Sequence, residues 1–166
     1  MKILVDTNIL VYSFDPWEPE KQKVADRALQ EGLAADELVI PHQAIVEFVS
    51  VAVRPRRETG GLPLLAREVA LREAEDFMRQ FPVVYPDAAV LQTALRGTLA
   101  YQLSWFDAHL WAYAEVHGID EILSEDFEHG RCYGSVRVRD PFLEATGEVP
   151  ELPARYESPA ATATRR

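Results

Sequence analysis

The chain has 166 residues, a length that suits one domain of ordinary size rather than two. Hydrophobic residues make up 48% of the chain and charged residues 27%, and this balance excludes a protein that is disordered along its whole length. Because 27 Asp and Glu residues outnumber 17 Lys and Arg residues, the net charge is −10, which argues against a protein that holds nucleic acid by bulk charge alone. The same charge is compatible with a nucleic-acid enzyme whose metal ions supply the positive charge.

Short apolar runs along the chain predict strands, and the amphipathic segments between them predict helices. The expected strands are residues 3–5, 38–40, 83–84, 122–123 and 136–138. The last of these alternates valine with arginine, a pattern that is typical of a strand at the edge of a sheet. The expected helices are residues 9–14, 21–33, 43–53, 65–80, 87–101 and 104–117.

The ends of two helices carry local signals. Asp87 and Ser104 are good N-caps, and Gly118 is a good helix end. The apolar side of the helix after Asp87 is expected to comprise Ala88, Leu91, Leu95 and Leu99.

This alternation predicts a three-layer α/β/α fold with a central, mostly parallel sheet and helices on both faces. We expect one domain over residues 1–145, followed by a Pro/Ala/Thr-rich tail over residues 146–166. Cys132 is the single cysteine, so neither an intrachain disulfide nor a cysteine-rich zinc site is expected. No apolar run approaches the ~20 residues of a membrane helix, and no signal peptide precedes the first strand, which predicts a cytoplasmic protein.

Four acidic residues are notable for their positions. Asp6 and Asp126 follow two predicted strands, and the carboxyl ends of parallel strands are where open α/β sheets build their sites. Glu47 lies one turn into a predicted helix with no Lys or Arg one turn away, and Asp107 lies in the first turn of another helix among apolar residues. Taken singly, each acid has an ordinary role: Asp6 as a helix cap, Glu47 as a solvated helix residue, Asp107 as an acid that the helix dipole favours, and Asp126 as a turn residue.

Several carboxylates close together raise one another's pKa and are stabilised by shared protons or by a hard divalent cation. Oxygen ligands without His or Cys favour Mg²⁺ or Mn²⁺ over Zn²⁺. Such ions support phosphodiester hydrolysis, because they activate water and stabilise the attacking and leaving oxygens.

Five segments together resemble the PIN-domain nucleases, and among them the VapC toxins of toxin–antitoxin modules. They are Val5–Leu10, the helix that contains Glu47, Leu103–Ala108, Leu123–Phe127 and Asp140–Phe142. The short Asp-Thr-Asn string is a weak signal by itself, whereas all the motifs in order form a specific pattern. The resemblance covers roughly residues 1–142 and implies a Mg²⁺- or Mn²⁺-dependent endoribonuclease.

The resemblance also implies roles for individual residues. Asp6, Glu47, Asp107 and Asp126 match the acidic metal-binding quartet of the family. The polar neighbours that would orient these acids and the phosphate are Thr7, Asn8 and Ser124. The implied partners are RNA, a cognate antitoxin and a second copy of the chain.

The basic loop Arg54–Pro55–Arg56–Arg57 follows the Glu47 helix, so Arg54 is a candidate for contact with substrate phosphates, with a solvated loop as the alternative. His109 is expected to be a structural or surface residue.

Two other hydrolase or signalling classes fit less well. A haloacid-type phosphatase would need an acid two residues after the first Asp, where this chain has Asn8. A receiver domain would need adjacent acids at the first strand. A PIN-like module that binds metal, RNA or a partner without cleaving RNA is the alternative that the sequence leaves open.

Overall fold

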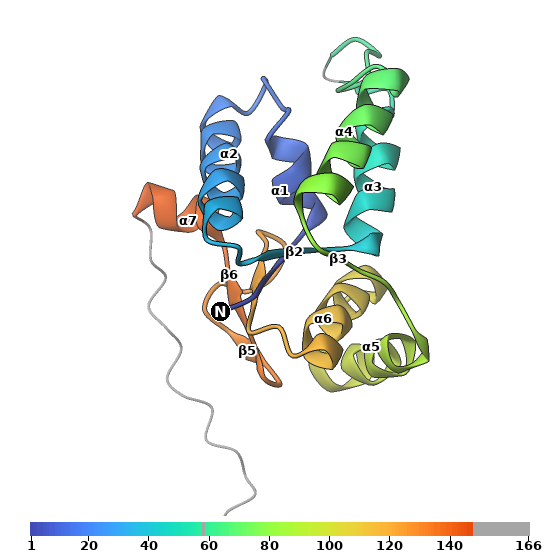
Figure 1. Ribbon diagram of the computed structural model, residues 1–166, viewed down its shortest axis with the longest axis vertical. Helices are drawn as coiled ribbons and strands as arrows, with labels where there is room; N and C mark the ends of the chain where they lie inside the picture. Colours follow the sequence, from blue (N-terminus) through green and yellow to red (C-terminus); the bar gives the residue numbers. More distant parts are fainter. Residues whose placement is uncertain (58, 148–166) are drawn as a thin grey trace, which may run out of the picture.

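The computed structural model describes residues 1–57 and 59–147, which form a sheet covered by helices (Figure 1). Within these residues six strands pair in the order β3-β2-β1-β4-β6-β5. Neighbouring strands are parallel except β5 and β6, which are antiparallel. The strands are β1 (Ile3–Val5), β2 (Leu38–Pro41), β3 (Val83–Val84), β4 (Glu121–Leu123), β5 (Cys132–Tyr133) and β6 (Val136–Arg139).

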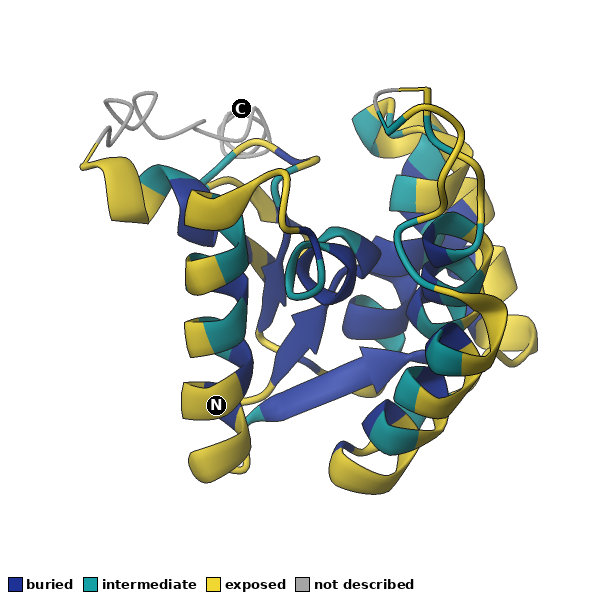
Figure 2. Ribbon diagram, turned by 90° about the horizontal axis from the view of Figure 1, so that it is seen from above, coloured by how far each residue is buried: buried dark blue, intermediate teal, exposed yellow. Residues whose placement is uncertain are grey.

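Helices cover both faces of the sheet. They are α1 (Thr7–Tyr12), α2 (Pro19–Ala34), α3 (His42–Ala52), α4 (Arg67–Gln80), α5 (Ala88–Tyr101), α6 (Trp105–His117) and α7 (Pro141–Thr146). In Figure 1, α1 to α4 lie on one side of the strands and α5 and α6 on the other. Figure 2 shows the strands buried between helices whose outer sides are exposed. The predicted α/β/α architecture with a mostly parallel sheet is therefore confirmed.

The pleat of the central strand β1 divides the core in two. Ile3 and Val5 point into the core beneath α1 to α4, whereas Leu4 points into the core beneath α5 and α6. All three side chains are buried, because a parallel strand in the middle of the sheet is covered on both faces. The register pairs Val5 with Leu123, so the residues that follow β1 and β4 emerge side by side at the carboxyl edge.

One predicted helix face is wrong. Leu91, Leu95 and Leu99 of α5 are 47%, 55% and 85% exposed, so the expected apolar side of this helix faces outward. The buried side carries Val90 and Gly97 instead and packs on α6. A Cβ atom on Gly97 would lie 2.4 Å from the Trp111 ring, so a close helix contact selects a small residue there.

Other differences concern short elements near the end of the described chain. The strand β5 and the helix α7 were not predicted, and β5 rather than β6 forms the edge of the sheet. The helix expected from residue 65 begins at Arg67. Of the predicted tail, residues 148–166 lie outside the described residues. No helix in the part of the chain that the structure describes is long and apolar enough to cross a membrane.

Candidate carboxylate site

A cavity of about 360 Å³ opens at the carboxyl edge of the sheet, and all four predicted acids line it. Asp6 comes from the end of β1, Glu47 from α3, Asp107 from α6 and Asp126 from the segment after β4. Residues up to 120 positions apart in sequence thus contribute carboxylates to one cavity. The fold brings together the quartet that the sequence singled out.

Asp6 caps the N-terminus of α1 and also lines this cavity. Its carboxylate accepts hydrogen bonds from the backbone N–H of Thr7 (2.6 Å) and from the hydroxyl of Ser124 (2.5 Å). Burial raises the pKa of Asp6 to about 7, and the nearby charges of Asp126 and Glu47 add to this rise although the hydrogen bonds oppose it. Burial and the neighbouring acids together therefore favour the protonated form of Asp6 below neutral pH.

Asn8 and Ser124 connect the acids at the ends of β1 and β4. The Asn8 amide nitrogen lies 3.1 Å from a carboxylate oxygen of Asp6 and 3.2 Å from one of Asp126. The Ser124 hydroxyl oxygen accepts the backbone N–H of Asp126 (3.0 Å). The Asn8 amide oxygen is buried and has no hydrogen-bond partner among the described residues.

Glu47 is held by two side chains. The Thr7 hydroxyl donates to one carboxylate oxygen (3.1 Å) and the Gln43 amide donates to the other (2.8 Å). The Gln43 amide oxygen lies 2.7 Å from Nδ1 of His109, so His109 is the donor in this contact. Burial lowers the pKa of His109, which favours the neutral ring, although the charge of Glu47 opposes this.

Gln43 and His109 form a hydrogen-bonded chain to Glu47, and the sequence predicts a site role for neither of them. Gln43 lies one helical turn before Glu47, and this spacing alone could have identified it. His109 acts from a different helix, so its contact depends on how α3 and α6 pack.

Asp107 is half-buried and Asp126 is exposed, whereas Asp6 is buried. The Ser104 hydroxyl donates to the Asp107 carboxylate (2.7 Å) and caps the Asp107 N–H (3.2 Å). Desolvation raises the pKa of Asp126, and the charges of Glu125 and Asp107 raise it further. The four acids thus interact electrostatically across the cavity.

The donor set suits a hard divalent cation, since it consists of carboxylate and amide oxygens. Across residues 1–57 and 59–147, however, no three His, Cys, Asp or Glu side chains come together tightly enough to form a metal centre by themselves.

Of the basic loop, Arg54 is the arginine that lines the carboxylate cavity. Arg56 instead forms an ion pair with the buried Asp15 (2.5 Å), so it ties the loop to the segment after α1. Arg57 is exposed.

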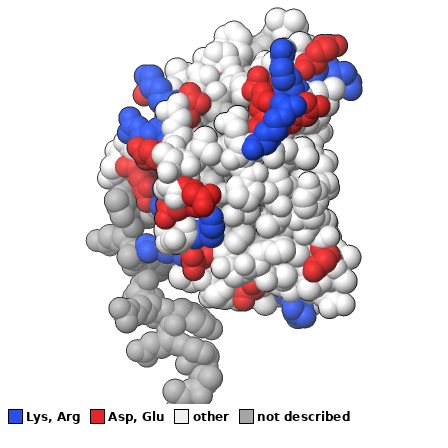
Figure 3. All heavy atoms as spheres, viewed as in Figure 1, with Lys and Arg blue, Asp and Glu red and all other residues white. Residues whose placement is uncertain are grey.

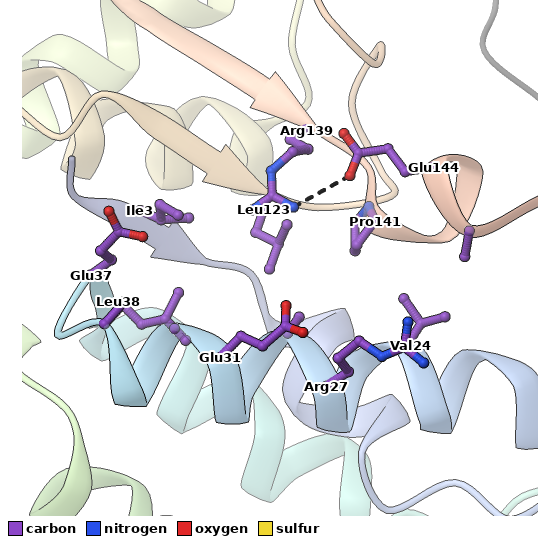
Figure 4. Close-up of a pocket in the computed structure, with 14 residues that line it drawn as sticks. Ile3, Val24, Arg27, Glu31, Glu37, Leu38, Leu123, Arg139, Pro141 and Glu144 are labelled. Carbon is purple, nitrogen blue, oxygen red and sulfur yellow. Dashed lines mark hydrogen bonds and ion pairs between the residues drawn. The ribbon is translucent and has the colours of Figure 1, made fainter. Parts of the chain in front are cut away.

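A second cavity of about 450 Å³ lies between α2, the start of β1 and α7 (Figure 4). Its charged residues include Arg27, Glu31 and the ion pair of Arg139 with Glu144 (3.4 Å). None of the four acids lines it, so it is separate from the carboxylate site.

A family model described as PIN domain matches residues 3–134. A search of curated protein sequences gives no match. Among solved structures, the chain is similar to the Mycobacterium tuberculosis toxin VapC20, which cleaves the sarcin–ricin loop, with a TM-score of 0.54 and 16% identity over 73% of this chain and 87% of that one. A toxin–antitoxin complex from Klebsiella pneumoniae gives a TM-score of 0.59 and 20% identity over 84% and 98% of the two chains. DNA-bound VapBC from Salmonella typhimurium gives a TM-score of 0.60 and 16% identity over 85% of this chain and 98% of that one. At these identities the likeness establishes a shared fold.

Proposed function

The chain belongs to the PIN-domain family, and from this premise we propose that it is a metal-dependent endoribonuclease that acts as the toxin of a toxin–antitoxin pair. The observation that carries the proposal is that Asp6, Glu47, Asp107 and Asp126 line a single cavity at the carboxyl edge of the sheet. Structural similarity to VapC20, a toxin that cleaves RNA of the sarcin–ricin loop, supports RNA as the substrate class.

We propose Mg²⁺ or Mn²⁺ as the cofactor and the four acids as its ligands. Two features of the site fit a cation: burial and the charges of Asp126 and Glu47 raise the pKa of Asp6, which a bound cation would oppose, and the Asn8 amide oxygen is a buried acceptor without a partner among the described residues. When bound, the cation would lower the pKa of an attacking water and stabilise charge on the phosphate.

The protein's own residues would prepare this site. Thr7 and Gln43 fix the Glu47 carboxylate, while Asn8 and Ser124 hold Asp6 and Asp126 together. Arg54, at the wall of the cavity, would contact a phosphate of the RNA. Water then attacks phosphorus in line with the leaving oxygen, one P–O bond forms as the other breaks, and no covalent enzyme intermediate is needed.

The proposed partners are an antitoxin and a second copy of the chain. Structures with the same fold include toxin–antitoxin complexes, and a net charge of −10 suits an antitoxin that brings basic residues to the acidic cavity. The outward side of α5, formed by Leu91, Leu95 and Leu99, is the surface that we assign to the dimer.

A PIN-like module that binds metal, RNA or a partner without cleavage is the second candidate. This module would use the same acids to bind a metal ion or a partner without cleaving RNA. Intact acids in one cavity favour the nuclease.

The deciding experiment incubates purified protein, freed of any copurified partner, with a mixed RNA pool and Mn²⁺ or Mg²⁺. The parent should give discrete fragments that disappear with chelator and with Asp107→Asn. The control Glu128→Gln alters an exposed acid outside the cavity and should cleave like the parent. Metal binding without any cleavage would support the non-cleaving module, and cleavage that survives chelator or Asp107→Asn would overturn the mechanism.

A further inference from the structure

Lys21, in the first turn of α2, makes an unusual set of contacts. Its ammonium donates to a carboxylate oxygen of Glu125 (2.5 Å) and to the hydroxyl of Tyr12 (2.9 Å). The same nitrogen lies 4.4 Å from the centre of the Tyr12 ring and 5.3 Å from the centre of the Phe142 ring. One ammonium group therefore joins α1, α2, α7 and the segment after β4.

The location of Lys21 is costly unless it has an acidic partner. The N-terminus of a helix carries partial positive charge, so a cation in the first turn is disfavoured. Burial by itself would lower the pKa of Lys21, but the hydrogen bonds to Glu125 and Tyr12 outweigh it and raise the pKa. These two partners thus stabilise the charged form of the ammonium.

Glu125 lies directly before Asp126, so its position limits where Asp126 can lie. On the other side of Asp126, Phe127 is buried in the core beneath α5 and α6. Asp126 is therefore flanked by an apolar anchor and by the ion pair with Lys21. Tyr12 ends the helix that carries Asn8, and Asn8 donates to Asp126.

We propose that Lys21 is a positioning residue of the carboxylate site: by holding Glu125 and Tyr12 together, it fixes the segment that carries Asp126 against the helix that carries Asn8. This inference rests on the proposed metal-dependent function. It assigns to Lys21 a role in metal affinity and turnover that its place outside the cavity would not suggest.

The test compares Lys21→Met and Glu125→Gln with the parent by titrating Mn²⁺ and by measuring RNA cleavage. Loss of contacts that orient metal ligands commonly costs 10- to 100-fold in affinity or activity. We expect each variant to bind Mn²⁺ about 10-fold more weakly and to lose about 10-fold in kcat, with KM for RNA within about two-fold of the parent. The double variant should be no worse than the poorer single variant, because both substitutions break the same ion pair.

Two controls separate positioning from stability. Lys23→Met removes an exposed lysine of the same helix, which pairs with Glu20, and should leave Mn²⁺ affinity unchanged. Leu29→Ala weakens the packing of α2 without touching the segment after β4, so it should lower Tm and leave Mn²⁺ affinity unchanged.

The inference is overturned if Lys21→Met and Glu125→Gln both bind Mn²⁺ within two-fold of the parent, or if Leu29→Ala weakens Mn²⁺ binding as much as they do. Should Lys21→Met fail to fold, the near-isosteric Glu125→Gln decides the matter. A parent that binds Mn²⁺ but cleaves no RNA would overturn the proposed nuclease and leave this comparison intact. A parent that binds no Mn²⁺ would overturn both.

Discussion

At the scale of single residues, two opposing effects set the pKa of Asp6. It caps α1 and accepts the Ser124 hydroxyl, which favours the ionised form, yet it lies where burial and neighbouring acids favour the protonated form. Burial and the neighbouring acids have the larger effect, since the pKa of Asp6 rises from 3.8 to about 7. An acid in this state is poised to exchange its proton for a cation.

The raised pKa predicts how stability depends on pH without metal. Between pH 3.8 and about 7 the folded protein keeps a proton on Asp6 that the unfolded chain releases, so the free energy of unfolding falls as pH rises through this window. Asp6→Asn removes this penalty. After allowing for weakened hydrogen bonds to Asn8 and Ser124, we expect the variant to be about 2 kcal/mol more stable than the parent at pH 8, and to lose this advantage below pH 4.

Urea unfolding of both proteins in chelator at pH 4 and pH 8 measures this difference. Equal differences at the two pH values would contradict the assignment of the penalty to Asp6. In the parent, added Mn²⁺ should raise Tm more at pH 8 than at pH 6, because at pH 6 the ion must displace the proton.

At the scale of elements, the contact between α5 and α6 shows how packing overrides a local preference. Gly97 lies in the middle of α5, where alanine would favour the helix by about 1 kcal/mol. A Cβ atom at this position would lie 2.4 Å from the ring of Trp111, which is itself anchored by a hydrogen bond from its indole nitrogen to the Tyr133 carbonyl (2.8 Å). The ring has little freedom to move away.

We therefore expect Gly97→Ala to destabilise the protein by about 1–3 kcal/mol, the range typical of an overpacked core. Leu99→Ala, on the outward side of the same helix, should change stability by less than about 0.5 kcal/mol. Chemical denaturation followed by tryptophan fluorescence measures both. A gain in stability for Gly97→Ala would mean that helix preference outweighs the contact with Trp111.

Some features of this fold can be predicted from the sequence because they are encoded locally. Buried strands such as β1 and capped helices such as α6 have local sequence patterns, and the motif acids stand out because they follow the ends of predicted strands or lie early in predicted helices. The outward orientation of the leucines of α5 could not be predicted, because a spacing of four residues identifies an apolar side of a helix but not whether that side is buried. In the site, Thr7, Asn8 and Ser124 were identified beside the motif acids, whereas His109 and Lys21 act from helices whose placement depends on tertiary packing.

At the scale of the whole molecule, charge is distributed unevenly over the surface. On the face drawn in Figure 3, Lys, Arg, Asp and Glu side chains gather mainly over the upper and left parts, and few lie over the region of α5 and α6. The exposed leucines of α5 are spaced by four residues and so form one continuous stripe on the helix. Two chains of net charge −10 repel each other where their acidic surfaces meet, so an apolar stripe is a suitable place for them to pair. A second copy of the chain presents the same apolar stripe.

This arrangement predicts a dimer that a single charged substitution in the stripe would dissociate. Leu95 lies in the middle of the stripe and is 55% exposed, so Leu95→Arg would place two arginines at a two-fold interface without disturbing the core. We expect the parent to be a dimer by light scattering and Leu95→Arg to be a monomer. Leu71→Arg, which alters an exposed leucine of α4 away from the stripe, should remain a dimer. A monomeric parent, or a dimer that survives Leu95→Arg, would show that α5 does not form the interface.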